Sequence, residues 1–289
     1  MRATTQLRNL LDEGSVLMAP GCHDALGAYF IQRAGFKVAY MTGYGVACSL
    51  LGRPDLGEIT MTEQIDHASR IAAAIDIPLI CDSDSGYGGP LNVQRAVREW
   101  QKAGVAAVHI EDQVEPKRCV AMEGMRVVDL KTAATRIKAA AAAKEDPDFI
   151  IIARTDSKPV HGLDHAIDRA KAFSDAGADM VYVELMQSRE EVEKVAKELA
   201  GYPLFIDVFE HPSCVVMSAN ELQELGFKVI SFPMTATLAY AKTLDKLYAD
   251  ILASGGRGAV VDQMMPLHPF EDIIKLKEVW EGVSELEKD

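Results

Sequence analysis

The sequence lacks the features that mark membrane proteins, secreted disulfide-rich proteins and zinc proteins. Its longest apolar runs, such as residues 149–153, have the length of a strand, so nothing in it predicts a membrane span. The five cysteines are scattered, and their spacing matches neither a zinc site nor a disulfide framework. The first residues lack the apolar stretch of a signal peptide, and we therefore expect a cytoplasmic protein.

Positive charge is also scarce. The 289 residues include 30 lysines and arginines against 43 aspartates and glutamates, a formal net charge of −13. Nucleic acid and anionic membranes would be repelled by such a field, and no basic run overrides it. A small anionic substrate is compatible with it, because a bound divalent cation can reverse the local potential. The charge therefore favours a small-molecule partner over nucleic acid or a membrane.

Short apolar runs alternate with amphipathic helical patterns along almost the whole chain. Helical patterns occur, for example, at residues 61–75, 92–103, 129–144 and 163–176. The predicted strands are residues 16–20, 38–42, 78–81, 106–110, 149–153, 180–183, 204–206 and 228–231. This alternation predicts either a closed (β/α)₈ barrel or an open doubly wound sheet.

The residues that end the predicted strands favour the barrel. They are polar or glycine-rich, at positions 21–24, 42–44, 82–84, 111–112, 154–156, 184 and 207. In a barrel these ends meet on one rim, where such enzymes carry out their chemistry, whereas an open sheet uses one or two switch points. Two further helical patterns, at 237–254 and 269–286, exceed what barrel closure requires. We predict one α/β TIM-barrel domain over residues 1–289, with a C-terminal helical extension at 237–289.

Two aspartates after the third predicted strand are the most informative residues. Asp82 and Asp84 are two positions apart and enter a glycine-rich turn, so both can reach the rim. Their hard oxygens suit Mg²⁺, which keeps several waters and takes further ligands from its substrate. Such residues also cap turns, but Glu111 and Asp112 end the next strand and could hold those waters. The two acidic strand ends together favour a metal site.

The segment after the fourth strand, residues 111–124, is long for a βα connection, and loops of this length in barrels are often lids. It contains Lys117, Arg118 and Cys119 in succession. A cysteine beside two cations can have a lowered pKa and exchange a proton. An isolated loop cysteine is more often incidental, so the assignment of Cys119 depends on its surroundings.

Two charged residues directly follow the fifth and sixth strands. Arg154 suits the bidentate capture of a carboxylate, and it could also form a salt bridge to Asp156 or Glu184. Glu184 is a candidate acid or base, or a residue that orients the site. His23 and His109 also lie near strand ends, but neither has metal-ligand spacing to another histidine. We interpret both histidines as structural polar contacts.

Together these segments resemble the isocitrate lyase/phosphoenolpyruvate mutase superfamily over nearly the whole chain. The Lys-Arg-Cys sequence points to its lyase-like branch, which includes methylisocitrate and dimethylmalate lyases. The segments that carry the resemblance are Ala-Pro-Gly-Cys-His-Asp-Ala at 19–25, Thr-Gly-Tyr-Gly at 42–45, Leu-Gly-Arg-Pro-Asp-Leu-Gly at 51–57, Asp-Ser-Asp-Ser-Gly-Tyr-Gly at 82–88, Ile-Glu-Asp-Gln at 110–113, Pro-Lys-Arg-Cys at 116–119 and Ala-Arg-Thr-Asp at 153–156.

The resemblance implies an assembly and a metal site. The barrel's last helix would be swapped between subunits, in a homotetramer built as two dimers. Mg²⁺, or alternatively Mn²⁺, would be bound at Asp82. The other residues that would contact the cation, directly or through water, are Asp55, Asp84 and Glu111.

The resemblance also implies the roles of the remaining residues. Arg154 would hold a carboxylate of the substrate, and Glu184 would help to bind or activate it. Lys117 and Cys119 would lie on a mobile loop, with Cys119 protonating the product enolate. The residues that would hold the 2-oxo acid end are Thr42, Gly43 and Tyr44.

The sequence departs from the family pattern in two places. Lyases usually continue Lys-Arg-Cys with Gly-His, whereas Val120 and Ala121 follow Cys119 here. Asp207 stands where relatives place an asparagine that contacts a distal carboxylate. Two carboxylates about 4 Å apart repel by roughly 1–4 kcal/mol, depending on the dielectric, unless one is protonated or paired. We therefore predict a substrate with a neutral, apolar or cationic group at that end.

The function predicted from the sequence is a carbon–carbon lyase. It would cleave a small 2-hydroxy acid, of the 2-alkylmalate or methylisocitrate type, into a 2-oxo acid and a carboxylate. The metal would act as a Lewis acid and Cys119 as a general acid. The alternatives are carboxyphosphonoenolpyruvate phosphonomutase-like chemistry, oxaloacetate hydrolase or decarboxylase activity, and a non-catalytic member that binds a metabolite.

Overall fold

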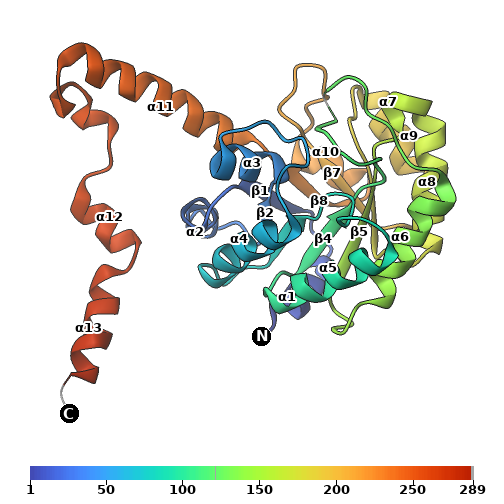
Figure 1. The fold of residues 1–289 in the computed structure, drawn as a ribbon, viewed down its shortest axis with the longest axis horizontal. Coiled ribbons are helices and arrows are strands. Elements are labelled where there is room, and N and C mark those ends of the chain that lie inside the picture. The colour runs from blue at the N-terminus through green and yellow to red at the C-terminus, as the bar shows by residue number, and fades with distance from the viewer. Residues whose placement is uncertain (121, 288–289) are drawn as a thin grey trace. The chain divides into compact units, whose positions relative to one another are not determined.

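Eight short apolar segments form a closed parallel barrel in which the strands follow one another in chain order (Figure 1). The computed structural model describes residues 1–120 and 122–287. The last strand pairs with the first, with Leu17 opposite Val229. The predicted (β/α)₈ TIM barrel is confirmed. The strands are β1 (Leu17–Cys22), β2 (Ala39–Met41), β3 (Leu79–Asp82), β4 (Ala107–Ile110), β5 (Ile150–Thr155), β6 (Met180–Val183), β7 (Leu204–Asp207) and β8 (Phe227–Phe232).

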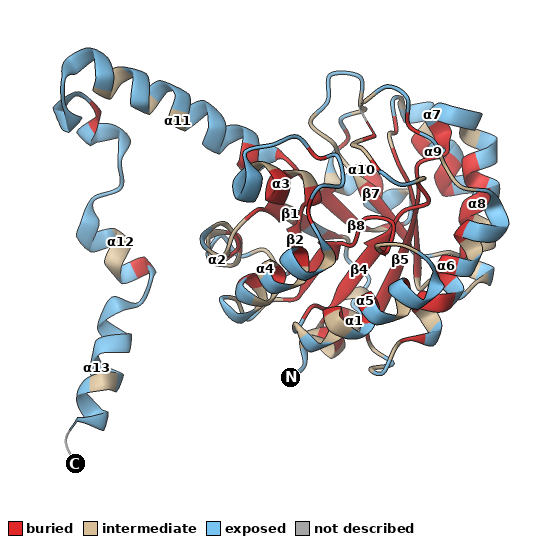
Figure 2. Ribbon diagram, viewed as in Figure 1, coloured by how far each residue is buried: buried red, intermediate tan, exposed pale blue. Residues whose placement is uncertain are grey.

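Helices surround the barrel, and the residues that each helix buries lie on its side facing the strands (Figure 2). Local sequence sets where they begin: Thr60 and Glu63 form a capping box that satisfies backbone N–H groups at the start of α4. Gly104 and Gly177 follow α5 and α8 with φ of 82° and 103°, which glycine adopts at little cost. The helices of this part are α1 (Ala3–Asp12), α2 (Ala25–Arg33), α3 (Gly43–Leu51), α4 (Met61–Ala73), α5 (Pro90–Lys102), α6 (Leu130–Ala142), α7 (Lys158–His161), α8 (Leu163–Asp175), α9 (Arg189–Glu198) and α10 (Ala219–Glu224).

The barrel interior is filled with side chains. Tyr40, Tyr182 and Phe205 are buried there among aliphatic residues of the other strands. The ring centroids of Tyr182 and Phe205 are 4.9 Å apart, within the range of favourable aromatic pairs. This packed layer is the floor beneath the polar strand ends, so the site above it is built on rigid elements.

The chain divides into two compact units, Met1–Thr237 and Leu238–Asp289. The additional C-terminal helices are present: α11 (Thr235–Ser254), the 3₁₀ helix η1 (Arg257–Gln263), α12 (Leu267–Ile273) and α13 (Leu276–Leu286). The prediction of one helix over 269–286 is wrong, because Lys275 adopts a left-handed conformation with φ of 58° and separates α12 from α13. No helix in the described part of the chain is long and apolar enough to cross a membrane.

Candidate active site

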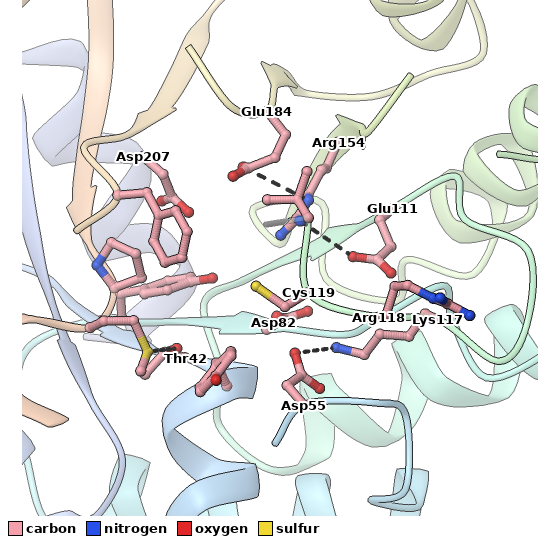
Figure 3. Close-up of a pocket in the computed structure, with 16 residues that line it drawn as sticks. Thr42, Asp55, Asp82, Glu111, Lys117, Arg118, Cys119, Arg154, Glu184 and Asp207 are labelled. Atoms are coloured by element: carbon pink, nitrogen blue, oxygen red, sulfur yellow. Dashed lines mark hydrogen bonds and ion pairs between the residues drawn. The ribbon is translucent and has the colours of Figure 1, made fainter. Parts of the chain in front are cut away.

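A pocket opens at the C-terminal ends of the strands, as the polar strand ends predict (Figure 3). Seven of the eight strands, β2 to β8, contribute side chains to it, either from the strand itself or from the loop that follows, so residues far apart in the sequence meet there. The lining residues are Tyr40, Thr42, Tyr44, Asp55, Asp82, Glu111, Lys117, Arg118, Cys119, Val120, Arg154, Glu184, Asp207, Phe209, Pro233 and Met234.

Carboxylates from β3 and β4 form the acidic side of the pocket. Asp82 ends β3, and its Oδ1 accepts a hydrogen bond of 2.9 Å from the backbone N–H of Asp84. Asp84 has φ of 45°, a conformation that is uncommon outside glycine, and its carboxylate pairs with Lys117. Glu111 directly follows β4 and is 3% exposed. Three buried carboxylates therefore lie at the ends of two adjacent strands.

Lys117 reaches into this acidic cluster. Its Nζ lies 2.6 Å from both Asp55 Oδ2 and Asp84 Oδ1, and the side chain is 3% exposed. Burial lowers the pKa of Lys117, but the surrounding carboxylates raise it well above its usual value, so the ammonium remains charged. Lys117 thus places a positive charge between two of the predicted metal-binding residues.

The acidic cluster fits a divalent cation by charge and by donor chemistry. Burial raises the pKa of Asp84 to about 7, opposed by Lys117 and reinforced by the neighbouring carboxylates of Asp82 and Asp55. Glu111 Oε1 is buried and has no hydrogen-bond partner among the described residues. Hard oxygen donors of this kind are what Mg²⁺ prefers. Within that same part of the chain, no three acidic, histidine or cysteine side chains are already arranged as a metal site.

Helix α3 begins at the edge of the same cluster. Thr42 caps it by accepting a hydrogen bond from the N–H of Gly45. A Cβ atom at Gly43 would lie 2.6 Å from Asp82 Oδ2, so glycine allows the helix to start beside that carboxylate. The first N–H groups of a helix attract anions. Thr42, Gly43 and Tyr44 are therefore placed to receive an oxygen-rich end of a ligand.

Arg154, at the end of β5, faces the pocket from the other side. Its Nε donates to Asp156 Oδ1 over 2.8 Å, while Glu184 Oε2 is 3.9 Å away, so the contacts suggested by the sequence are present. Its guanidinium also lies 5.5 Å from the centre of the Tyr182 ring. Asp156 holds Nε, and the terminal Nη2 lies 3.7 Å from Glu111 Oε2 in an ion pair, so the bidentate binding of a carboxylate that arginine favours would take place beside Glu111.

Glu184 and Asp207 contribute two acids on the β6 and β7 side. Glu184 Oε2 and Asp207 Oδ1 are buried oxygens without a hydrogen-bond partner among the described residues. Burial raises the pKa of Glu184 well above its usual value. Burial also raises the pKa of Asp207 to about 8, with contributions from other acids of the site, so Asp207 is mostly neutral at pH 7. The repulsion expected from Asp207 therefore applies only at higher pH.

The loop after β4 lies over the pocket. Cys119 and Val120 line it, and the thiol of Cys119 points into it (Figure 3). The backbone N–H of Cys119 donates to Asp55 O over 3.2 Å. Arg118 donates to Glu123 O within the loop over 2.9 Å. Ala121, which the sequence singles out next to Val120, is outside the described residues.

Two residues of the site were missed by the sequence reasoning or interpreted as structural. Tyr40 lines the pocket, and its hydroxyl lies 2.6 Å from His109 Nε2. Burial lowers the pKa of His109 to about 4, so this histidine is neutral and its approach to Asp82 is not an ion pair. His23 lies 3.1 Å from Thr237. The structure thus agrees with polar contacts for both histidines, whereas the position of Tyr40 had no signal in the sequence beyond its place in a strand.

Charged and apolar side chains both line the pocket. Among the described lining residues, the cations are confined to Lys117, Arg118 and Arg154. The loops that follow β7 and β8 add the apolar side chains of Phe209, Pro233 and Met234, and Met234 Sδ accepts a hydrogen bond from Thr42 Oγ1 over 3.8 Å. The pocket can therefore bind a small acid that carries an apolar group.

Known proteins resemble this chain over most of its length. The phosphoenolpyruvate phosphomutase family matches residues 7–252. The chain is 37% identical to 2,3-dimethylmalate lyase of Eubacterium barkeri, over 97% of both chains. It is 36% identical to 2-methylisocitrate lyase of Halalkalibacterium halodurans, over 96% of this chain and 89% of the relative. A crystal structure of 2,3-dimethylmalate lyase superimposes with a TM-score of 0.93 at 37% identity, over 99% of this chain and 96% of the other. The chain belongs to the phosphoenolpyruvate phosphomutase family, within the isocitrate lyase/phosphoenolpyruvate mutase superfamily.

Proposed function

We propose that this protein is a divalent-cation-dependent carbon–carbon lyase. It cleaves a small 2-hydroxy acid, of the 2-alkylmalate or methylisocitrate type, into a 2-oxo acid and a carboxylate. The observation that carries the proposal is one pocket in which a carboxylate cluster, Arg154 and the thiol of Cys119 face each other. Relatives that are named lyases, with which the chain shares more than a third of its residues, support it.

The carboxylate cluster is where we propose the cation binds. Asp82 would hold it, with Asp55, Asp84 and Glu111 contacting it directly or through water, and Mg²⁺ or Mn²⁺ suits these donors. Lewis-acid stabilisation of negative charge on the substrate oxygens is the chemistry that this cation supplies when bound. Lys117 pairs with two of the same carboxylates, so its ammonium limits the negative charge of the cluster.

The remaining residues bind the substrate and move protons. Arg154 holds a carboxylate through its terminal nitrogens, while Thr42, Gly43 and Tyr44 hold the 2-oxo acid end. A base, for which buried Glu184 is the candidate, takes the hydroxyl proton as the carbon–carbon bond breaks. The bonding electrons remain on the departing carbon as an enolate, and the thiol proton of Cys119 moves to that carbon. Proton return from the base to the thiolate restores the enzyme.

Asp207 limits which acids fit. It lines the pocket together with the apolar side chains of Phe209 and Met234, so we propose that the group bound beside Asp207 is neutral, apolar or cationic rather than a further carboxylate. A neutral Asp207 can hydrogen-bond such a group at pH 7. When ionised, it repels a carboxylate at about 4 Å by roughly 1–4 kcal/mol.

A substrate panel tests the lyase proposal. Metal-free enzyme would be incubated with 2-alkylmalates, 2-methylisocitrate, oxaloacetate and a phosphonate analogue of the oxo acid, with and without added Mg²⁺. The proposal predicts release of a 2-oxo acid from at least one 2-hydroxy acid, dependent on Mg²⁺. Turnover of oxaloacetate or the phosphonate alone would support the hydrolase or mutase alternative, and binding without turnover would support a non-catalytic member.

The C-terminal unit bears on assembly. Several of its large apolar side chains are exposed, including Tyr248, Leu252, Trp280 and Leu286, as expected of a surface that packs against something else. We propose a homotetramer of helix-swapped dimers, as the family resemblance implies. Light scattering should give the mass of four chains for the whole protein and a smaller species after removal of residues 255–289. An unchanged tetramer after truncation would contradict the swap.

A further inference from the structure

A single buried amide, that of Gln113, lies between the loop that carries Cys119 and the strand that carries Arg154. Gln113 comes three residues after the end of β4 and is 1% exposed. In the sequence, Gln113 stands out only as the last residue of the segment Ile-Glu-Asp-Gln at 110–113. Its side chain nevertheless contacts both halves of the proposed active site.

The amide of Gln113 makes three hydrogen bonds. Its Nε2 donates to Asp156 Oδ2 over 2.7 Å and to the backbone O of Arg118 over 2.9 Å. Its Oε1 accepts from the backbone N–H of Arg118 over 3.0 Å. Two acceptors therefore face the NH₂ group and one donor faces the oxygen, which fixes the orientation of the amide. The side chain of Gln113 thus binds both the backbone N–H and the backbone C=O of Arg118, the residue between Lys117 and Cys119.

Asp156 continues the connection toward the substrate. Its second oxygen, Oδ1, accepts from Arg154 Nε over 2.8 Å. Asp156 is fully buried, and its backbone N–H donates to Asp112 Oδ1 over 2.9 Å, so it has little freedom to follow another partner. A chain of charge-assisted and neutral hydrogen bonds therefore runs from the Arg118 backbone through Gln113 and Asp156 to the guanidinium.

The base of the loop is fixed independently of this side chain. The backbone N–H of Val114 donates to Arg126 O, and that of Val128 donates to Asp112 O, each over 2.9 Å. Arg136 donates to the backbone O of Gln113 over 2.8 Å. The backbone of Gln113 is thus anchored at the base of the loop. The hydrogen bonds of its side chain to Arg118 therefore depend on where the loop segment beyond it lies.

We propose that Gln113 is a positioning residue that couples carboxylate binding at Arg154 to the placement of the loop that carries Lys117 and Cys119. This inference rests on the proposed function, in which Arg154 binds a carboxylate and Cys119 is the proton donor. A carboxylate on Arg154 fixes the guanidinium and, through Asp156 and Gln113, stabilises the loop position that presents the thiol. Since such coupling is reciprocal, the placed loop also strengthens carboxylate binding.

Alkylation of Cys119 measures this coupling without any turnover. Iodoacetamide modification of the Cys119 peptide would be followed by mass spectrometry, with Mg²⁺ present and with or without saturating oxalate as the carboxylate probe. In the wild type we expect oxalate to slow alkylation by about tenfold or more, within the usual range of coupling between sites. Gln113→Glu, which keeps the shape but removes both donated hydrogen bonds, should alkylate faster without oxalate and respond to it by less than about twofold.

Asp156→Asn weakens the same chain of hydrogen bonds at its contact with Arg154 and leaves the hydrogen bonds between Gln113 and Arg118 in place. Without oxalate, Cys119 in this variant should be alkylated at the wild-type rate, but oxalate should no longer slow the reaction. Gln101→Glu is the matched control, because Gln101 also makes several hydrogen bonds to backbone groups, but on α5 and away from the pocket. It should keep the full oxalate response.

A wild-type oxalate effect that survives in Gln113→Glu or in Asp156→Asn would overturn the proposal, as would its absence from the wild type or an equal loss in Gln101→Glu. These outcomes are separate from the proposed function, because a protein that cleaves no 2-hydroxy acid could still show the coupling. In an active enzyme, Gln113→Glu should lower kcat more than it raises KM.

Discussion

The two ends of the barrel differ in how completely their carboxylates are hydrogen-bonded. At the end where β6 begins, Asp179 accepts from Arg8 at 2.5 Å, from Lys144 at 3.0 Å and from the backbone N–H of Ile151 at 2.9 Å. At the rim where the strands end, four buried carboxylate oxygens have no hydrogen-bond partner among the described residues. One of them, Asp84 Oδ1, lies 2.6 Å from Lys117 Nζ in an ion pair, and the other three are Glu111 Oε1, Glu184 Oε2 and Asp207 Oδ1.

This difference separates stability from function. A buried polar group without a partner costs about 1–3 kcal/mol of folding free energy, so a fold shaped only for stability would pair the rim as it pairs the opposite end. Three residues that follow strand ends at the rim, Asp84, Tyr87 and Leu185, have positive φ of 45°, 62° and 63°, a strained conformation outside glycine. Strain and unpaired oxygens at one end indicate groups that a ligand completes.

Asp82→Ala should have the largest effect on activity of the substitutions that distinguish the two ends of the barrel. It removes the central carboxylate of the rim, and we expect activity to fall below detection while the protein still folds. Circular dichroism and a 2-oxo acid release assay would measure the two effects. Undiminished activity in this variant, or in enzyme treated with EDTA, would contradict the assignment of a metal site to Asp82.

Cys119→Ser tests the proton donor above the rim. Loss of a general acid costs about 10²–10⁴-fold in rate, so kcat should fall by that factor while Mg²⁺ and pyruvate still bind. Steady-state kinetics together with calorimetric binding would separate the two. A variant with near-normal kcat on the best substrate of the panel would refute the role.

Asp207→Asn tests whether Asp207 limits the range of substrates. The wild type should discriminate against a further carboxylate by about one to three decades when Asp207 is ionised, from a repulsion of roughly 1–4 kcal/mol. Because burial raises the pKa of Asp207 to about 8, the discrimination should grow as pH rises through 8. The asparagine variant should discriminate less and show no such pH dependence in kcat/KM.

Several charged groups surround Asp207 and define that pH test. Glu210, Asp82 and Asp156 raise its pKa, and Arg154 lowers it. Efficient cleavage of 2-methylisocitrate or 2,3-dimethylmalate by the wild type at pH 9, with no gain in the asparagine variant, would show that Asp207 does not set the substrate range. Stability gives an independent check of the sign. A folded pKa above the ordinary value means that stability falls as pH rises toward 8, and Asp207→Asn should make that fall smaller, since Asp84 and Glu184 also have raised pKa values.

Asp179→Ala should have the smallest effect on activity and a clear effect on stability. It leaves Arg8, Lys144 and the N–H of Ile151 without their shared acceptor, and we expect a loss of about 1–3 kcal/mol. Thermal unfolding should show a lower Tm, while kcat and KM on the best substrate remain within about twofold of the wild type. A large fall in kcat with unchanged stability would erase the distinction between the two ends.

The sequence predicted the barrel and several site residues for simple physical reasons. Each strand is a short apolar run, and a charged residue such as Asp82, Arg154 or Glu184 directly after such a run must emerge at its end. These positions require only local information. The break between α12 and α13 was missed because the left-handed conformation of Lys275 is set by its surroundings and not by a glycine or proline in the sequence.

The rest of the site depends on contacts between distant residues. Lys117 and Asp55 form an ion pair across 62 positions of the chain, and Gln113 meets Asp156 across 43. Nothing in the sequence distinguishes Tyr40 from any other aromatic residue in a strand. The pKa of Asp207 could not be foreseen either, because it depends on burial, and it limits the predicted repulsion to higher pH.

Calorimetric titration of metal-free protein with Mg²⁺ in the presence of oxalate tests most directly whether the unpaired rim is a ligand site. The account predicts about one Mg²⁺ bound per chain in the wild type and in Asp179→Ala, and no binding in Asp82→Ala. Equal binding by all three proteins, or none by the wild type, would contradict it.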